Sequence, residues 1–186
     1  MAPTTTPTLD DFQRVAKTVS GIAIKTPMLE SDYLTELSGS KVNFKCENLQ
    51  RTGSYKLRGA YNILSKLSAA DKKKGVVAAS AGNHAQGVAL AAQKLGCKAL
   101  IVMPVTTPQI KVHAVRARGA SVLLHGDSYS DAYVHARKLA SQRKLCFVHP
   151  YDDPDVIAGQ GTIGMEILRQ AEQPIDAIFV AIGGGG

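Results

Sequence analysis

Apolar residues along the chain occur either at helical spacing or in short continuous runs. The alternation of these two patterns predicts where helices and strands lie. Near the N-terminus, Thr8 is placed to cap a helix whose apolar residues recur at helical spacing, namely Leu9, Phe12, Val15, Ala16 and Val19. From about residue 42 onward, short apolar runs are each followed by a glycine or polar turn and then by an amphipathic segment. Such runs are typical of strands and such segments of helices, so the pattern predicts a series of βα units.

The predicted strands and helices alternate through most of the chain. Strands are expected at 42–46, 75–80, 98–103, 120–125, 145–149 and 175–182. Helices are expected at 83–96, with Asn83 as a candidate cap, from about Pro108, from about Tyr129, and from Pro154, with Asp153 as its cap. This order predicts an α/β fold with a mainly parallel sheet, and ligands of such sheets bind outside the carboxyl ends of the strands.

Composition narrows the class of protein without identifying it. The 186 residues have a formal net charge of +7, but no aromatic residues interleave with the densest basic run, 72–74, so nucleic acid is not expected as a partner. No apolar run approaches the roughly 20 residues that span a bilayer. The first residues, MAPTTTPTLDDF, lack the pattern of a secretory signal. We therefore expect a cytoplasmic protein without membrane contact, although a removed organelle transit peptide would leave no trace.

The cysteines give no indication of a metal or disulfide framework. Cys46, Cys97 and Cys146 lie about fifty residues apart and match no zinc or redox spacing. We expect them to be small buried hydrophobic residues, and no metal site is predicted.

Three short stretches carry candidate chemistry. In "SAGNHA", 80–85, the backbone N–H groups at a helix start and the Ser80 hydroxyl could hold a carboxylate, although an ordinary βα turn has the same pattern. In "GGGG", 183–186, bare backbone N–H groups follow an apolar run and suit a phosphate, although linkers also contain glycine runs. In "SYKLRGA", 54–60, Lys56 lies among apolar residues at a helix start, as a surface lysine or as a half-buried amine.

These three features together favour one cofactor. Pyridoxal phosphate carries a phosphate and an aldehyde, and a lysine holds the aldehyde as a Schiff base. An amino-acid substrate would supply the carboxylate. The sequence therefore predicts a pyridoxal-phosphate enzyme that acts on an amino acid.

Longer motifs resemble a known family nearly from end to end. They are "CENLQRTGSYKLRGAYN" from Cys46, "VVAASAGNHAQGVAL" from Val76, "VMPVTTPQIKV" from Val102, "HGDSYSDA" from His125, "PYDDPDVIAGQGTIGMEI" from Pro150 and "IGGGG" at the end. In this order they resemble the threonine dehydratases (threonine ammonia-lyases) of the pyridoxal-phosphate β-family. The resemblance implies the two-domain fold shared with serine racemase and tryptophan synthase β.

The resemblance also implies roles for individual residues. Lys56 would bind the cofactor aldehyde, Asn83 would hydrogen-bond its phenolic oxygen, and the glycines of the tetraglycine would surround its phosphate: Gly183, Gly184, Gly185 and Gly186. The substrate carboxylate would be received by residues of the turn: Ser80, Ala81, Asn83 and His84. Tyr55 stands where phenylalanine is commoner in the family.

The implied reaction is elimination from a β-hydroxy amino acid. Lys56, once released, would remove the α-proton, the β-hydroxyl would leave, and threonine would give 2-oxobutanoate and ammonia, or serine pyruvate and ammonia. Serine racemases of the family resemble the dehydratases but carry a serine at position 81, which supplies a second base. Ala81 cannot accept or return a proton, which favours elimination, with a racemase-like enzyme as the alternative.

The family's domain organisation implies that 1–53 begin a large domain, 54–150 form a small mobile domain, and 151–186 return to the large domain. Family members continue well past the tetraglycine, so the resemblance describes a C-terminally incomplete fold that stops inside its own cofactor site. The chain is then part of a lyase that we expect to form homo-oligomers, or a non-catalytic unit whose exposed apolar edge favours self-association or a complementing partner.

Overall fold

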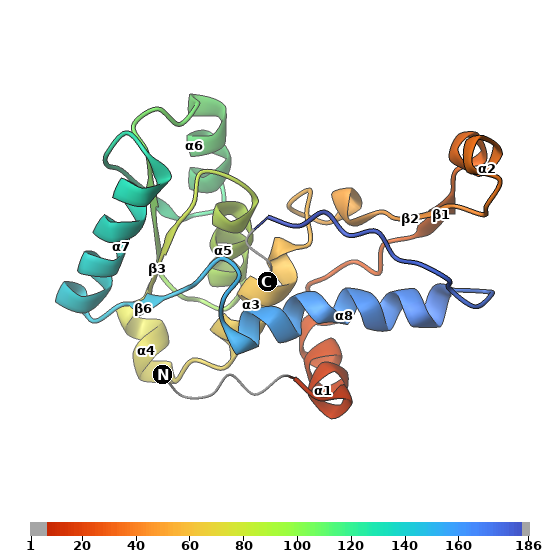
Figure 1. Ribbon diagram of the computed structural model, residues 1–186. Coiled ribbons are helices and arrows are strands. Elements are labelled where there is room, and N and C mark those ends of the chain that lie inside the picture. Colours follow the sequence, from red (N-terminus) through yellow and green to blue (C-terminus); the bar gives the residue numbers. More distant parts are fainter. Residues whose placement is uncertain (1–6, 184–186) are drawn as a thin grey trace.

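The computed structural model describes residues 7–183, and from β3 to α8 its helices and strands alternate in the predicted order, whereas β1, α2 and η1 were not predicted (Figure 1). In chain order the elements are α1 Leu9–Val19, β1 Met28–Glu30, α2 Asp32–Ser38, β2 Asn43–Lys45, the short 3₁₀ helix η1 Glu47–Leu49, α3 Lys56–Ser65, α4 Ala69–Lys74, β3 Val76–Ala79, α5 Asn83–Lys94, β4 Ala99–Met103, α6 Gln109–Arg116, β5 Ser121–Leu124, α7 Tyr129–Arg143, β6 Cys146–Phe147 and α8 Pro154–Gln170.

A parallel sheet forms one half of the molecule and has the strand order β5-β4-β3-β6. The register pairs Val76 of β3 with Ala99 of β4 on one side and with Cys146 of β6 on the other. Every residue of β3 is buried because the strand lies inside the sheet and is covered on both faces. The α/β class and the parallel sheet are therefore as predicted.

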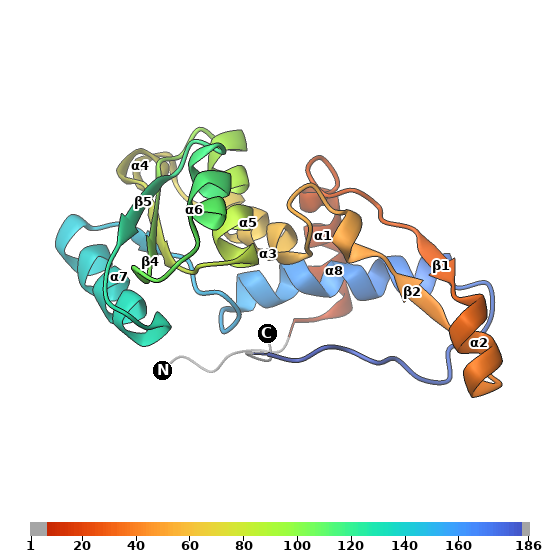
Figure 2. The ribbon, with the colours of Figure 1, turned by 90° about the horizontal axis from the view of Figure 1, so that it is seen from above.

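Alternate residues of the strands belong to two separate cores. Val76 and Ala78 face a core shared with α5 and α3, whereas Val77 and Ala79 face a core shared with α7. This period of two is the one that a pleated strand imposes. Figure 2 shows α5 and α6 on one side of the sheet and α7 on the other, so the carboxyl end of β3 opens between layers of helices.

The other half of the molecule is built around the long helix α8, against which α1 and α3 pack. Thr8 caps α1 as predicted, and the structure shows a full capping box: the Thr8 hydroxyl accepts a hydrogen bond from Asp11 N, and the Asp11 carboxylate accepts one from Thr8 N. Asp153 and Pro154 begin α8 as cap and first residue, also as predicted. The antiparallel pair β1–β2 and α2 form an arm at the end of the molecule away from the parallel sheet (Figures 1 and 2).

Two glycines allow α3 and α8 to cross in direct backbone contact. A Cβ atom at Gly159 of α8 would lie 2.4 Å from Gly59 Cα and 2.8 Å from Arg58 O. A Cβ atom at Gly59 would meet Val156 O at 2.7 Å. No side chain larger than hydrogen fits at either position unless the helices separate.

Several predictions about local structure are wrong. Residues 175–182 form no strand, and Phe179 and Ile182 are 98% and 79% exposed, because the described chain offers that segment no neighbouring strand to pair with. Gly82 rather than Asn83 is the cap of α5, and Asn83 is the first helical residue. The three cysteines are free and half-buried rather than fully buried. Within residues 7–183 no helix is long and apolar enough to cross a membrane.

Candidate functional site

Lys56 is the first residue of α3 and lies beside the carboxyl ends of the parallel strands. Its side chain is half-buried, and Nζ donates a hydrogen bond of 2.8 Å to Pro150 O, in the segment that follows β6. Burial lowers the pKa of the Lys56 ammonium group. Within residues 7–183 Lys56 makes no ion pair, so a half-buried amine is present without a carboxylate to hold its charge.

The backbone of Lys56 is held closely by the neighbouring helix. A Cβ atom at Gly87 of α5 would lie 3.0 Å from the carbonyl carbon and oxygen of Lys56 and from Leu57 N. The small residues of α5, including Ala91 and Ala92, are buried and allow this helix to lie between α3 and the sheet. Glycine at position 87 thus lets α5 approach the start of α3 directly.

The turn between β3 and α5 presents free backbone donors. Ser80 Oγ accepts hydrogen bonds from Gly82 N and Ala85 N, each at 3.2 Å, and these bonds fix the turn. The N–H groups of Asn83 and His84, in the first turn of α5, have no acceptor within the helix. Because the helix dipole also favours negative charge here, the turn is suited to an anion such as a carboxylate.

His84 is buried in this turn and is neutral at physiological pH. Its Nε2 lies 3.1 Å from Val148 O, and since a carbonyl can only accept, Nε2 carries the proton. Burial, with smaller contributions from Lys56 and His149, lowers the pKa of His84 to about 4 against the effect of that hydrogen bond. Nδ1 is then a buried acceptor, and it has no partner among the described residues.

The segment after β6 connects Lys56 with His84. Val148 O faces His84 and Pro150 O faces Lys56, so two carbonyls of one short segment orient both side chains. The His149 ring lies between them in sequence, and its Nδ1 accepts hydrogen bonds from Tyr151 N at 3.3 Å and from Asp152 N at 2.8 Å. This segment was not predicted as part of the site, and its sequence signal is weak because the interacting groups are backbone carbonyls.

The structure brings together only some of the predicted site residues. Lys56, Ser80 and His84 gather at the strand ends, and Ala81 lies in the same turn. The Asn83 side chain is exposed and makes no hydrogen bond to another described residue. Gly183 is exposed, and a Cβ atom there would meet no atom within 4 Å, so it does not contact the other candidates. Gly184, Gly185 and Gly186 lie outside the described residues.

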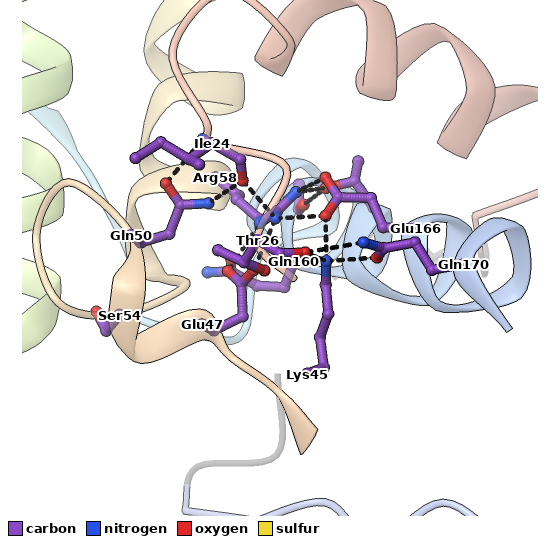
Figure 3. A network of polar contacts seen from close by, with 12 residues as sticks. Ile24, Thr26, Lys45, Glu47, Gln50, Ser54, Arg58, Gln160, Glu166 and Gln170 are labelled. Carbon is purple, nitrogen blue, oxygen red and sulfur yellow. Dashed lines mark hydrogen bonds and ion pairs between the residues drawn. The ribbon is translucent and has the colours of Figure 1, made fainter. Parts of the chain in front are cut away.

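A buried ion-pair network lies on the other side of α3 and was missed by the sequence analysis. Arg58 is fully buried, and its guanidinium group makes bidentate hydrogen bonds to Glu47 and to Glu166 (Figure 3). Lys45 Nζ donates to Glu166 at 2.6 Å and also to Thr26 O. The signal in the sequence was an arginine two residues after Lys56, next to Leu57 and Gly59, but its partners lie up to 108 positions away.

Comparison with known proteins identifies the class. Residues 19–186 match the family described as pyridoxal-phosphate dependent enzyme, and the chain belongs to this family. It is 56% identical over 168 residues to "Threonine dehydratase biosynthetic, chloroplastic" of Arabidopsis thaliana, a match that covers 90% of this chain and 28% of the relative. Among solved structures it is similar to the processed form of threonine deaminase isoform 2 from Solanum lycopersicum, with 47% identity and a TM-score of 0.83, over 90% of this chain and 48% of that one.

Serine racemase from Dictyostelium discoideum has the same fold, with a TM-score of 0.83 and 36% identity over 91% of this chain and 55% of that one. The chain therefore spans about a quarter to a half of the length of the relatives that it matches. The predicted family and the predicted fold are confirmed.

The described residues fit the cofactor that defines the family. A half-buried amine without an acidic partner, a buried histidine nitrogen without a donor, and a helix start with two N–H groups that have no acceptor within the helix lie at the same strand ends. These are the groups that an aldehyde, a polar bound group and an anion would need. Among residues 7–183 no three His, Cys, Asp or Glu side chains are grouped so as to hold a metal ion.

Proposed function

We propose that the protein is a pyridoxal-phosphate-dependent ammonia-lyase that converts L-threonine to 2-oxobutanoate and ammonia, and L-serine to pyruvate and ammonia. The observation that carries this proposal is the Lys56 amine, half-buried without an acidic partner beside the start of α5, in a chain 56% identical to a threonine dehydratase. In the net reaction the α-carbon is oxidised from amine to ketone while the β-carbon is reduced from alcohol to alkyl carbon, so no external oxidant or reductant is needed. The water lost with the β-hydroxyl is taken up again when the imine is hydrolysed to the oxo acid and ammonia.

Lys56 is proposed to hold the cofactor and then to move the α-proton. When bound, pyridoxal phosphate supplies an aldehyde that condenses with amines and a ring that accepts the electron pair left by the α-proton. Because burial lowers the pKa of Lys56, a larger fraction of the amine is neutral at physiological pH and able to accept a proton. The hydrogen bond to Pro150 O directs the amine toward the strand ends.

The turn from Ser80 to His84 is proposed to bind the substrate carboxylate. The N–H groups at the start of α5 supply donors, and the bonds accepted by Ser80 Oγ keep them in place. We propose that Asn83 contacts the phenolic oxygen of the cofactor, since its exposed side chain is free of other described hydrogen bonds. Gly183 to Gly186 are proposed to surround the phosphate, in the manner that the family resemblance implies.

A racemase is the second candidate, because the fold is shared with a serine racemase. Racemisation needs a second group able to return a proton to the opposite face of the α-carbon. Position 81 carries alanine, which has no such group, and this favours the lyase.

We further propose that the region from 54 to 150 moves as a small domain relative to 1–53 and 151–186. The compact parallel sheet with its own helices supports this division, although α3 packs against α8 as well as α5. We propose that the protein forms homo-oligomers and acts in the cytoplasm, and the plant relative with a chloroplast name makes an organelle the alternative.

An absorption spectrum with pyridoxal phosphate, before and after borohydride, tests the proposal. A Schiff-base band that borohydride traps in the wild type, but not in Lys56→Ala, is expected. Formation of 2-oxobutanoate from threonine, with D-serine measured in parallel from L-serine, then separates the lyase from the racemase. A trapped band of equal intensity in Lys56→Ala would remove Lys56 from the site.

A further inference from the structure

Burying Arg58 costs desolvation free energy, and a gain in folding stability does not explain why the protein keeps it buried. A guanidinium group carries a permanent charge, and taking it out of water together with two carboxylates is often no better than packing apolar side chains in the same space. Yet the Arg58 side chain is 0% exposed, and those of Glu47 and Glu166 are only 11% and 18% exposed. In some proteins a buried ion pair fixes one geometry at a cost in stability, and the question is which geometry Arg58 fixes.

The bonds of Arg58 converge from elements that are distant in sequence. Nε and Nη2 donate to the Glu47 carboxylate at 2.9 and 2.7 Å, and Nη1 and Nη2 donate to the Glu166 carboxylate at 2.7 and 3.0 Å. Nη1 also lies 3.2 Å from Thr162 Oγ1, and Nη2 lies 3.3 Å from Ile24 O. One side chain of α3 is thereby attached to η1, to α8 and to the segment before β1 (Figure 3).

The attached residue is in the first turn of α3, two positions after Lys56. The cap residue of this helix, Tyr55, makes no side-chain hydrogen bond to the helix start, and the same holds for the cap residues of α5 and α6, whereas α1, α2, α4, α7 and α8 have such a cap. Within an α-helix, residues two apart point to nearly opposite sides. Arg58 therefore holds the turn from one side while Lys56 extends to the strand ends on the other.

We propose that Arg58 is a positioning residue for Lys56: its bidentate hydrogen bonds to Glu47 and Glu166 anchor the first turn of α3 and hold the Lys56 amine in its half-buried position. This inference rests on the proposed role of Lys56, and deepens it. On the other side, α5 packs directly against the backbone of Lys56 and Leu57 at Gly87. The first turn of α3 is therefore held between the ion-pair network and α5. The network contains two cations and two anions, Lys45 and Arg58 against Glu47 and Glu166, so it holds the turn without adding net charge near Lys56.

The test measures Lys56 itself and needs no cofactor. In the full-length protein, freed of cofactor by dialysis against hydroxylamine, each lysine is methylated with formaldehyde and cyanoborohydride, and the rate at Lys56 is followed against pH by peptide mass spectrometry. Exposed Lys73 serves as the internal reference. Arg58→Lys keeps the positive charge but loses the paired hydrogen bonds of the guanidinium group to each carboxylate. We expect the Lys56 amine then to become more exposed to water, and its pKa to rise. For a rise of about one unit, the Lys56 rate at pH 7.5 falls about 10-fold and its inflection moves to higher pH.

The matched control is Lys45→Met. This change also removes a bond to Glu166 from the same network, but it leaves both forks of Arg58 in place. We expect Lys45→Met to keep the wild-type Lys56 profile. The charged or titratable groups near Lys56 are Tyr55, whose ring centroid lies 5.2 Å from Nζ, His84 of α5 and His149 after β6, and they are the same in all variants.

The outcomes separate this inference from the proposed function. An unchanged Lys56 profile in folded Arg58→Lys, or an equal shift in Lys45→Met, would overturn the positioning role. If Arg58→Lys does not fold by circular dichroism, Glu47→Gln, which keeps the guanidinium group and weakens one fork, replaces it, and a folded Glu47→Gln with the wild-type profile overturns the inference. Failure of pyridoxal phosphate to label Lys56 in the wild type contradicts the proposed function alone, because the formaldehyde profile does not depend on that cofactor.

Discussion

The close crossing of α3 and α8 predicts how much stability is lost when a Cβ atom is added at Gly159. In Gly159→Ala the new Cβ would lie 2.4 Å from Gly59 Cα and 2.7 Å from Gly59 N. Both are backbone atoms, so no side chain can rotate away, and ordinary contact at 3.4 Å or more requires the helices to separate by about 1 Å. A gap of that size forfeits roughly a quarter to a half of the dispersion energy along the contact.

The expected loss of stability follows from two opposing effects. Overpacking a well-packed contact costs about 1–3 kcal/mol, and the rigid backbone at Gly159 points to the upper end of this range. Replacing a helical glycine by alanine returns about 0.5–1 kcal/mol because the unfolded chain loses freedom. The net loss is about 2 kcal/mol, which lowers Tm by about 6 °C for a chain of this size.

Gly164→Ala on the same helix is the matched control. Gly164 is exposed, and a Cβ atom there meets nothing within 4 Å, so only the gain remains. We expect its Tm to rise by about 2 °C. Thermal unfolding followed by circular dichroism compares the two variants. A Gly159→Ala protein as stable as Gly164→Ala would refute the direct backbone contact on which this reasoning depends.

Two further predictions concern buried charge. The pKa of His84 is lowered from 6.5 to about 4 by burial, so the unfolded chain binds a proton first on acidification, and about 3 kcal/mol of stability is lost as pH falls from about 6.5 to 4. His84→Gln can still donate a hydrogen bond to Val148 O but does not titrate. Its urea midpoint should therefore change less between pH 6.5 and 4 than that of the wild type, and an equal change in both proteins would contradict this prediction. Glu166→Ala leaves Arg58 with an unpaired buried donor and should cost about 3 kcal/mol in urea unfolding, whereas Glu30→Ala, whose pair with Lys41 is exposed, should change stability by less than about 1 kcal/mol; similar losses would argue against the burial of the network.

Local patterns predicted the elements whose causes are local. The cap at Thr8 and the Asp153–Pro154 start of α8 both depend on neighbours in sequence, and both are present. Residues 175–182 have the composition of a buried strand, but a strand exists only when another backbone accepts its hydrogen bonds, and composition does not reveal that partner. The segment is exposed for this reason.

Only part of the site was predicted, because sequence patterns reveal local structure but not contacts between distant residues. Lys56 and the turn from Ser80 could be found because each has a recognisable sequence context at a strand or helix end. The network of Arg58 could not, since its carboxylates lie 11 and 108 positions away and only the fold brings them together. The roles of the Val148 and Pro150 carbonyls could not be predicted from the sequence either, because every residue has a backbone carbonyl.

The packing of α1 against α8 has a consequence for synthesis on the ribosome. About 140 residues separate the two helices, so at 5–20 residues per second α1 waits roughly 10–30 s for its partner to be made. During that interval the strands of the parallel sheet, which are close together in sequence, can already associate. Val15 and Val19, buried in the finished protein, are then exposed on the nascent chain and are natural points for a chaperone to bind.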